Sequence, residues 1–384
     1  MRVTGDWIGQ TGSQALCRLL EGAGHQALFV GGCVRNALLD APVADVDIAT
    51  DAWPKTVSDL ARQAGFRVIP TGIEHGTVTV AAHGHPYEVT TFRRDVETDG
   101  RRAVVAFSDR IEEDAARRDF TMNALYARAD GTVIDPLGGL PDLLARRLRF
   151  VGDPGARIRE DYLRILRFFR FHAWYGDPQE GLDAEGLAAC AELSAGIETL
   201  SRERIGAEMR KLLAAPDPAP AVAAMAAAGV LAQILPGADV RALPVLVHLE
   251  DGLAPDAMRR LAVLSGEDAA DRLRLSNAEA RDLAALRHSL GQDDSPAALA
   301  WRLGASRGGD ALLLRAALTG TPPAPGWQNE LVRGAAASFP VSAADLMPAL
   351  QGPALGARLR ALEAEWLRSG LRKGKKELLK NSGA

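Results

Sequence analysis

Two aspartates spaced two residues apart, Asp45 and Asp47, follow a glycine pair at Gly31 and Gly32. On a β-strand, residues i and i+2 point to the same face, with Cα atoms about 6.5 Å apart. Carboxylate oxygens are the ligands that hard divalent cations prefer, and glycines between a strand and a helix can present backbone N–H groups to a phosphate. The pattern predicts metal-assisted phosphoryl or nucleotidyl transfer, with Asp45 and Asp47 as metal ligands.

Other charged residues can join this site. Glu88 lies in an alternating stretch and supplies a third carboxylate if a neighbouring strand brings it beside the aspartates. Arg35, one helical turn after the glycines, can reach the same phosphate. Asp161, Arg164 and Arg167 are spaced as i, i+3 and i+6. On a helix this spacing places the three side chains on one face. Each pattern also has an ordinary structural interpretation. Glu88 can be a cross-strand charge, the glycine pair can form a tight turn, and Asp161 can form an intrahelical ion pair with the arginines.

The elements that must position these residues follow from periodicity. Alternation and turn residues predict strands over 26–30, 66–69, 77–82 and 87–92, a strand carrying both aspartates, and helices over 14–21, 34–39 and 54–64. The polar, glycine-containing segment 93–102 predicts a mobile loop, and 111–127 is predicted to be helical. The first 135 residues therefore form a small mixed sheet with flanking helices.

The remainder of the chain has a helical pattern. Ala, Leu, Arg and Glu at helical spacing replace the β-branched runs, and proline-rich segments at 216–220 and 322–325 mark joints. We therefore predict an α+β fold with a catalytic head over 1–135, a helical neck over 136–215, a helical body over 216–320 and a helical tail over 321–384. The apolar run 219–235 predicts one buried helix, because a membrane span needs about 20 residues of greater hydrophobicity.

Composition narrows the class of protein. The 384 residues are 47% hydrophobic and 24% charged, as in soluble globular proteins. The N-terminus shows no signal-peptide pattern, and Cys17, Cys33 and Cys190 fit reduced thiols without zinc spacing, so we expect a cytoplasmic protein. The net charge is −4, yet basic residues gather at 157–170 and 368–380, which permits RNA binding without requiring it.

Seven motifs in a fixed order resemble a known family. They are Gly31-Gly32-x-Val34-Arg35-Asn36, Asp45-x-Asp47-Ile48-Ala49-Thr50, Glu88-Val89-Thr90-Thr91-Phe92-Arg93, Arg117-Arg118-Asp119-Phe120-Thr121-x-Asn123-Ala124, Asp135-Pro136-x-Gly138-Gly139, Glu160-Asp161-x-x-Arg164-x-x-Arg167 and Ser201-Arg202-Glu203-Arg204-Ile205. Over residues 26–213 the chain resembles class II tRNA nucleotidyltransferases (CCA-adding enzymes) and their bacterial poly(A) polymerase relatives.

The resemblance implies a role for each motif. Asp45 and Asp47 would hold two Mg²⁺ ions, with Glu88 as the third catalytic carboxylate. The triphosphate would be cradled by Gly31, Gly32 and Arg35, and the nucleotide would be oriented by Arg118, Asp119 and Asn123. Asp161 and Arg164 would choose the base, with Arg167 supporting that pair or holding phosphate. A carboxylate that accepts from an exocyclic amine, beside a guanidinium that donates to a ring nitrogen, favours cytosine and adenine over uracil and guanine.

The expected reaction is template-independent addition of C, C and A to the acceptor end of tRNA from CTP and ATP, with release of pyrophosphate. The motifs fit equally a poly(A) polymerase or an enzyme that adds only A, and they leave open the oligomeric state and the choice between Mg²⁺ and Mn²⁺. A non-catalytic RNA-binding descendant is disfavoured because all three carboxylates are present. No His-Asp dipeptide occurs, so we expect no phosphohydrolase activity, and we expect no membrane partner.

Overall fold

The computed structural model describes residues 1–70, 72–99 and 102–380. The chain divides into two compact units, the first comprising residues 1–201 with 227–233 and the second comprising residues 202–226 with 234–384. Every residue predicted to bind metal or nucleotide lies in the first unit. The finer division into head, neck, body and tail stays a prediction.

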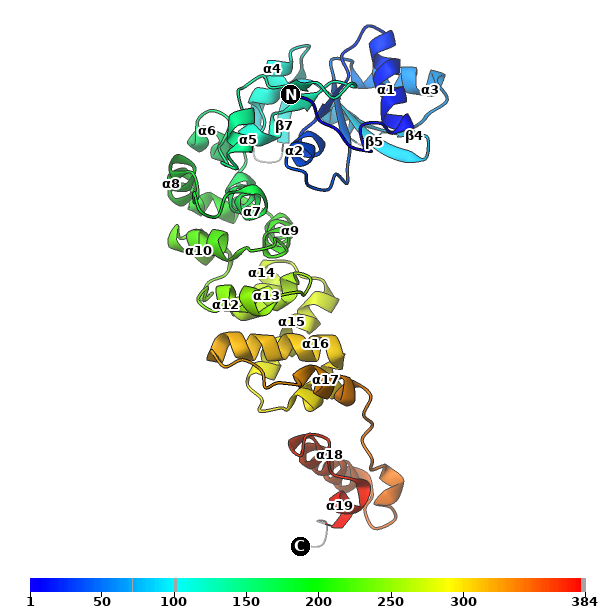
Figure 1. The fold of residues 1–384 in the computed structure, drawn as a ribbon, viewed down its shortest axis with the longest axis vertical. Coiled ribbons are helices and arrows are strands. Elements are labelled where there is room, and N and C mark those ends of the chain that lie inside the picture. Colours follow the sequence, from blue (N-terminus) through cyan, green and yellow to red (C-terminus); the bar gives the residue numbers. More distant parts are fainter. Residues whose placement is uncertain (71, 100–101, 381–384) are drawn as a thin grey trace. The chain divides into compact units, whose positions relative to one another are not determined.

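A seven-stranded sheet lies at the centre of the first unit, in the order β3-β4-β5-β2-β1-β8-β9 (Figure 1). Only β2 and β5 pair in parallel; the other neighbours are antiparallel. The strands are β1 (Leu28–Val30), β2 (Asp47–Thr50), β3 (Arg67–Ile69), β4 (Thr77–Ala82), β5 (His85–Thr91), β8 (Tyr126–Ala127) and β9 (Val133–Ile134). The predicted mixed sheet is confirmed.

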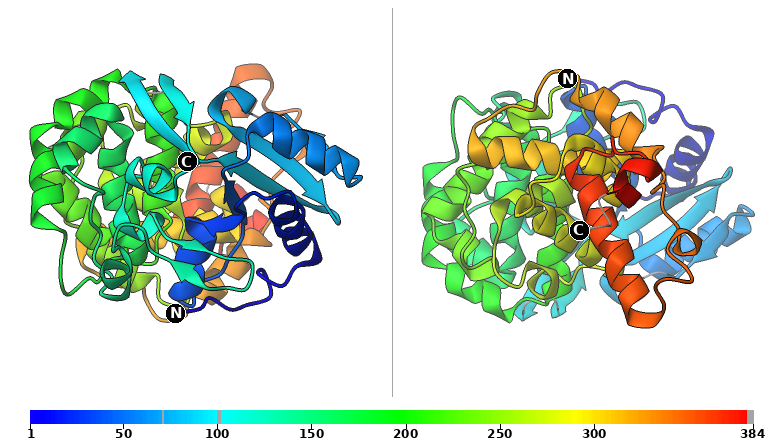
Figure 2. Two further views of the ribbon diagram at one scale, coloured as in Figure 1. Left: turned by 90° about the horizontal axis from the view of Figure 1, so that it is seen from above. Right: turned by 90° about the horizontal axis from the view of Figure 1, so that it is seen from below.

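The two faces of this sheet have different coverings. Helices α1 (Thr11–Gly22) and α3 (Pro54–Gln63) pack against one face, as Figure 2 shows. Asp47 shares the opposite face with Ala49, because alternate residues of a strand point the same way. That face contributes to a buried cluster of Leu28, Val30, Ala49, Phe92, Ala115, Ala124, Tyr126 and Val151. The face of the sheet that carries Asp47 therefore also packs against a hydrophobic core.

Outside this sheet, the described part of the first unit is helical except for two paired strands over residues 93–99 and 102–107. It contains α2 (Gly32–Leu38), α4 (Ile111–Ala116), α5 (Leu140–Leu144), α6 (Pro154–Glu160), α7 (Leu163–Tyr175), α8 (Ala184–Glu192) and α11 (Val230–Ile234), with 3₁₀ turns over Ile73–His75, Thr121–Asn123 and Ser194–Thr199.

The described part of the second unit is all helical. Its helices are α9 (Arg202–Leu213), α10 (Ala219–Ala227), α12 (Leu243–Leu249), α13 (Ala257–Leu264), α14 (Ala269–Arg272), α15 (Asn277–Leu290), α16 (Pro296–Thr319), α17 (Trp327–Ala335), α18 (Gly352–Arg368) and α19 (Lys375–Lys380), with a 3₁₀ turn over Ala343–Asp345. Across residues 1–70, 72–99 and 102–380, no helix has the length and apolar character needed to cross a membrane.

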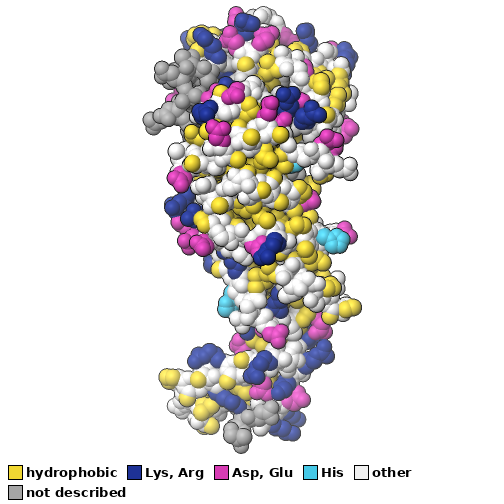
Figure 3. Space-filling view, turned by 90° about the vertical axis from the view of Figure 1, so that its left-hand side faces the viewer, with side chains coloured by type: hydrophobic (Ala, Val, Ile, Leu, Met, Phe, Trp, Pro, Cys, Tyr) yellow, Lys and Arg dark blue, Asp and Glu magenta, His cyan; other side chains and the backbone are white. Residues whose placement is uncertain are grey.

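Charges in the second unit are extensively paired. The buried Glu250 carboxylate, at the end of α12, binds both Arg259 and Arg260. In the C-terminal basic segment, Lys373 pairs with Glu365, and Lys375 with Asp345. On the face shown in Figure 3, Lys and Arg side chains are interspersed with Asp and Glu side chains. Ion pairing therefore offsets part of the positive charge expected from the sequence of the tail.

Two expectations about the head were wrong. The segment 93–102 forms a hairpin of β6 (Arg93–Asp99) and β7 (Arg102–Phe107), with residues 100–101 outside the described part. The predicted helix over 111–127 ends at Ala116, and Tyr126 enters the sheet, where it pairs with Val30. In both cases strand pairing overrides the local composition.

Two expected helices in the rest of the chain are interrupted. The run 219–235 is divided between α10 and α11 by Gly229, whose φ of +73° is incompatible with a continuing helix. Asp161 also breaks the helix expected to carry it, because its φ of −157° and ψ of 105° are extended. Asp161 therefore stands before α7, whereas Arg164 and Arg167 lie on it.

A substitution at Gly196 tests whether packing against Tyr162 holds the segment that follows Asp161. A Cβ on Gly196 would lie 2.0 Å from Cε1 of Tyr162, so the Tyr162 ring needs a residue without a side chain there. We expect Gly196→Ala to lower the free energy of unfolding by about 1–3 kcal/mol through overpacking. Gly22→Ala, at the end of α1 with open space around it, is the control and should change stability by less than about 1 kcal/mol. Urea unfolding midpoints measure both; equal values would contradict the packing described.

Candidate functional site

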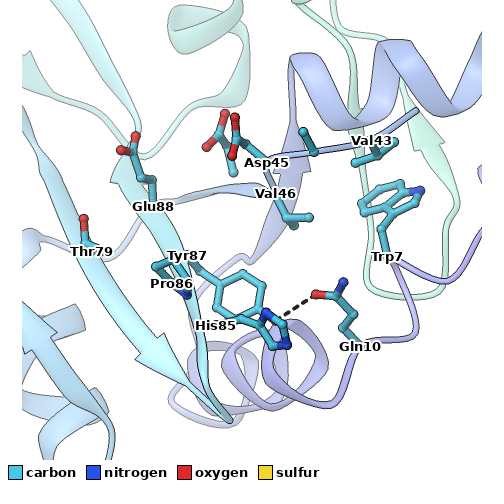
Figure 4. A pocket seen from close by; sticks show the side chains of 12 residues that line it. Trp7, Gln10, Val43, Asp45, Val46, Thr79, His85, Pro86, Tyr87 and Glu88 are labelled. Carbon is cyan, nitrogen blue, oxygen red and sulfur yellow. Dashed lines mark hydrogen bonds between the residues drawn. The ribbon is translucent and has the colours of Figure 1, made fainter. Parts of the chain in front are cut away.

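Three carboxylates line one cavity of about 410 Å³ at the end of the sheet. Asp47 is the first residue of β2, and it is paired in register with Glu88 on the parallel strand β5. Asp45 precedes β2 by two residues instead of lying within it, which corrects the expectation of one strand carrying both aspartates. Figure 4 shows the carboxylates of Asp45 and Glu88 on the same side of this cavity.

The closeness of these carboxylates has an electrostatic consequence. Burial, and then repulsion from Glu88 and Asp45, raise the pKa of Asp47 from 3.8 to about 6, against an opposing effect of Arg118. A divalent cation would relieve this repulsion, and oxygen donors suit Mg²⁺, so the residues fit such an ion. Within the described residues, however, no three His, Cys, Asp or Glu side chains are gathered tightly enough to form a metal site. The structure thus brings the three acids to one cavity, but not into one three-ligand cluster.

A turn flanked by guanidinium groups lies beside β2. Gly31 ends β1 with a φ of +71°, which favours glycine, and its N–H donates to the carbonyl of Leu125. A Cβ on Gly31 would lie 3.3 Å from Nη1 of Arg118, and one on Gly32 would lie 3.8 Å from Nη2 of Arg35. The two glycines therefore leave open a small space beside two positive charges, as an anion seat requires.

Arg118 is fixed by a buried acid that the sequence analysis did not single out. Its Nη2 donates to Asp114 at 2.9 Å, its Nε to the hydroxyl of Tyr126 at 3.1 Å, and Arg117 binds the same carboxylate. Burial acts to raise the pKa of Asp114, but Arg118 and Arg117 outweigh it and hold that pKa at about 2. The i, i+4 spacing of Asp114 and Arg118 was the available sequence signal.

A second buried network joins the other predicted nucleotide-binding residues. Oδ1 of Asp119 accepts from the Asn123 amide, and its Oδ2 accepts from Arg167 at 2.7 Å. Arg35 in turn donates to Oδ1 of Asn123 at 2.5 Å. Burial acts to raise the pKa of Asp119, but Arg167 and the Asn123 amide hold it at about 2. These side chains are thus positioned by one another.

Arg35 also reaches a residue 140 positions away. Its Nη2 donates to the hydroxyl of Tyr175 at 2.9 Å, and its guanidinium lies over the Tyr175 ring, 4.1 Å from the centroid. Arg35 is 93% buried and is committed to these partners, rather than pointing into open space toward a phosphate. Its predicted contact with a nucleotide stays a prediction. No sequence pattern indicated Tyr175, the last residue of α7.

Asp161 and Arg164 lie at the start of α7. Oδ1 of Asp161 accepts the N–H of Leu163 at 3.1 Å, and the Arg164 guanidinium binds the Glu160 carboxylate and the carbonyls of Arg157 and Arg117. The bond to Arg117 ties Arg164 to the segment that carries Arg118 and Asp119. The predicted residues are therefore gathered within one unit, around the end of the sheet and the start of α7.

Comparison with known proteins identifies similar sequences. The chain matches the family model of the poly A polymerase head domain over residues 27–149, and that of the probable RNA- and SrmB-binding site of polymerase A over residues 182–241. It is 44% identical over 204 residues to the CCA-adding enzyme of Lacticaseibacillus paracasei, and 42% identical over 203 residues to the mitochondrial CCA tRNA nucleotidyltransferase 1 of Mus musculus. Each alignment covers 53% of this chain and 50% or 47% of the relative, so the match spans about half the length of these curated relatives.

A solved structure is similar over nearly the whole chain. The CCA-adding enzyme of Bacillus stearothermophilus in complex with CTP has a TM-score of 0.71 and 30% sequence identity, and the match covers 97% of each chain. Similarity of this extent covers the helical second unit as well as the sheet.

The buried acids predict a specific acid sensitivity. Because the pKa values of Asp114 and Asp119 are lowered in the folded chain from 3.8 to about 2, their contribution to stability is present above about pH 4 and is lost as the pH falls through 2. Each shift corresponds to about 2 kcal/mol. Asp114→Asn should therefore lose less stability between pH 4 and pH 2 than the unmodified protein does.

Urea unfolding at several pH values measures this slope. Asp59→Asn, which changes an exposed acid on α3, is the control and should retain the full acid dependence. An unchanged slope in Asp114→Asn would contradict the charge pairing assigned here.

Proposed function

Because this chain belongs to the family of CCA-adding enzymes and poly(A) polymerases, we propose that it adds C, C and A to the 3′ end of tRNA from CTP and ATP. The single observation that carries the proposal is the cavity shared by Asp45, Asp47 and Glu88 beside a glycine turn flanked by Arg118 and Arg35. An acidic compartment next to a basic one is what joining a hydroxyl to a nucleoside triphosphate requires. The unpaired, buried thiols fit a reducing compartment, and we place the enzyme in the cytoplasm.

In this mechanism the basic side of the site binds the triphosphate. Arg118, held by Asp114, and the open space at Gly31 and Gly32 receive phosphate oxygens. Asp119 and Asn123, fixed by Arg167 and Arg35, orient the nucleotide. The RNA 3′-hydroxyl gives its proton to water, a new O–P bond forms to the α-phosphate, and the bond from the α-phosphate to the leaving pyrophosphate breaks. Positioning and charge stabilisation supply the rate enhancement.

Asp45 and Asp47 are the residues that would hold two Mg²⁺ ions, with Glu88 nearby. When bound, such ions supply Lewis-acid stabilisation of the charge that develops at phosphorus and at both reacting oxygens. Burial, and then repulsion from Glu88 and Asp45, raise the pKa of Asp47, and the repulsion supports this assignment, since cations would remove it.

Base selection is proposed for Asp161 and Arg164. The carboxylate accepts from the exocyclic amine of cytosine or adenine, and the guanidinium donates to the neighbouring ring nitrogen. In the structure both groups are held in place, Asp161 by the Leu163 N–H and Arg164 by Glu160. Uracil and guanine present a carbonyl beside an N–H, and so meet mismatched contacts.

One experiment tests the reaction. Purified protein receives a tRNA lacking its last three nucleotides with CTP alone, ATP alone, or both, and products are resolved by length. Two C additions followed by a single A are expected. Repeated use of ATP on unrelated RNA would assign poly(A) synthesis instead, and A addition only to tRNA already ending in CC would assign A-only activity.

The carboxylates should be essential in that assay. Asp45→Ala is expected to lower incorporation from both CTP and ATP by at least about 10³-fold, because metal-held charge stabilisation is lost. Binding of tRNA, followed by filter retention, should stay within about threefold. Asp59→Ala is the control and should retain activity; full activity in Asp45→Ala would remove the metal proposal.

Asp161 should affect the selection among nucleotides more than the rate of nucleotide addition. We expect Asp161→Ala to reduce discrimination against UTP and GTP by about 10–100-fold, since a paired hydrogen bond of about 1–3 kcal/mol is lost. Values of kcat/KM for all four nucleotides measure this. If UTP and GTP are rejected as strongly as before, the selecting residues lie elsewhere.

A further inference from the structure

Five side chains form a hydrogen-bonded circuit that begins and ends on helix α7. The hydroxyl of Tyr175 accepts from Arg35 at 2.9 Å, and Arg35 donates to Asn123 at 2.5 Å. The Asn123 amide donates to Asp119 at 2.9 Å, and the other carboxylate oxygen of Asp119 accepts from Arg167 at 2.7 Å. Tyr175 and Arg167 both lie on α7, whereas the other three residues come from the head. The circuit therefore joins this helix to the residues expected to orient the nucleotide.

An aromatic residue shields this circuit. Phe171, on α7 between Arg167 and Tyr175, is buried, and its ring centroid lies 5.2 Å from the Arg35 guanidinium and 5.1 Å from that of Arg167. Arg35 also lies 4.1 Å above the centroid of the Tyr175 ring. Hydrogen bonds in such a setting are stronger than hydrogen bonds exposed to water. The circuit is therefore a rigid part of the head.

Within the circuit, Arg35 determines which way the Asn123 amide faces. A guanidinium group only donates, so the atom of Asn123 that faces Arg35 must be its oxygen, and its nitrogen then faces Asp119. Asn36 accepts from Nε and Nη2 of Arg35 and so holds one edge of the guanidinium. The hydroxyl of Tyr175 holds Nη2 from the side of α7. Tyr175 therefore contributes to the position of Asn123 without contacting it.

Helix α7 has further attachments near its base-selecting end. Arg164 donates to the carbonyl of Arg117 at 3.2 Å, and Arg167 binds Asp119 one turn later. Tyr175 is the last residue of the helix, at the opposite end from these two contacts. The start of α7 is therefore held without Tyr175, so the loss of the Tyr175 hydroxyl should act on Asn123 rather than on base selection.

We propose that Tyr175 is a positioning residue for nucleotide addition. Its hydroxyl holds Arg35, and Arg35 fixes the Asn123 amide. That amide, together with Asp119, orients the bound nucleotide for attack on its α-phosphate. The proposal rests on the proposed function and adds to it a residue that lies outside all the sequence motifs. Because Tyr175 acts through alignment, it affects the rate of the chemical step more than the affinity for the nucleotide.

Tyr175→Phe removes the hydroxyl and keeps the aromatic ring that stacks on Arg35. In single-turnover reactions with truncated tRNA, we expect the rate of C addition to fall about tenfold, since a misplacement of about 1 Å can cost about 100-fold. The half-saturating CTP concentration and the preference for CTP over UTP should each change less than twofold. Ser58→Ala, which removes a buried hydroxyl bonded to the Pro54 carbonyl on α3, is the control and should leave all three values unchanged.

Double-mutant cycles separate positioning from a general structural effect. If Tyr175 acts through Asn123, Tyr175→Phe should change the rate less than twofold in the Asn123→Ala background. Arg35→Lys gives a second cycle, because an ammonium lacks the planar fork that bridges both partners, and Tyr175→Phe should again add less than twofold.

Three results would overturn the role of Tyr175 while leaving nucleotide addition intact. These are an unchanged rate in Tyr175→Phe, a tenfold loss that persists in both backgrounds, and a loss confined to the half-saturating CTP concentration. If the unmodified protein adds no nucleotide, the proposed function fails, and the role of Tyr175 fails with it.

Discussion

Repulsion among Asp45, Asp47 and Glu88 is the constraint on which the rest of the head depends. The parallel pairing of β2 with β5 brings Asp47 and Glu88 into register, and the partial burial of Asp47 increases the cost of its negative charge. Positive charge nearby lowers this cost. Arg118 supplies the fixed part of that charge, and bound cations would supply the rest.

The arginines beside the acidic end of β2 are held by buried hydrogen-bonding partners. Arg118 uses Asp114 and Tyr126, whereas Arg35 uses Asn123 and Tyr175. Removing one partner of a buried ion pair such as that of Arg118 and Asp114 typically costs about 3–5 kcal/mol, because a charge is left buried alone. The networks therefore give the site its geometry, and they link residues from distant parts of the sequence within one unit.

Much of the head could be predicted from alternation and turn residues, because β1, β4 and β5 have clear patterns. Pairing across the sheet could not be predicted for Tyr126, whose surroundings in sequence favour a helix but which completes the sheet beside Val30. Tyr162, which follows the break at Asp161, packs against Gly196, 34 positions away, and such a contact is not visible in local sequence. Tyr175 also had no sequence signal. The local sequence pattern thus predicted the strands and the acidic residues, whereas tertiary contacts determine how the arginines are held.

Among the described residues that line the cavity of the three carboxylates near Trp7 there is no Lys or Arg, and this has a consequence for inhibitor chemistry. In the metal-free protein, a compound that fills this space is favoured if it donates hydrogen bonds or carries positive charge, since carboxylates accept hydrogen bonds and attract cations. Cationic or hydroxyl-rich compounds are therefore better matched to the lining of this cavity in the metal-free protein than phosphate-bearing nucleotide mimics are.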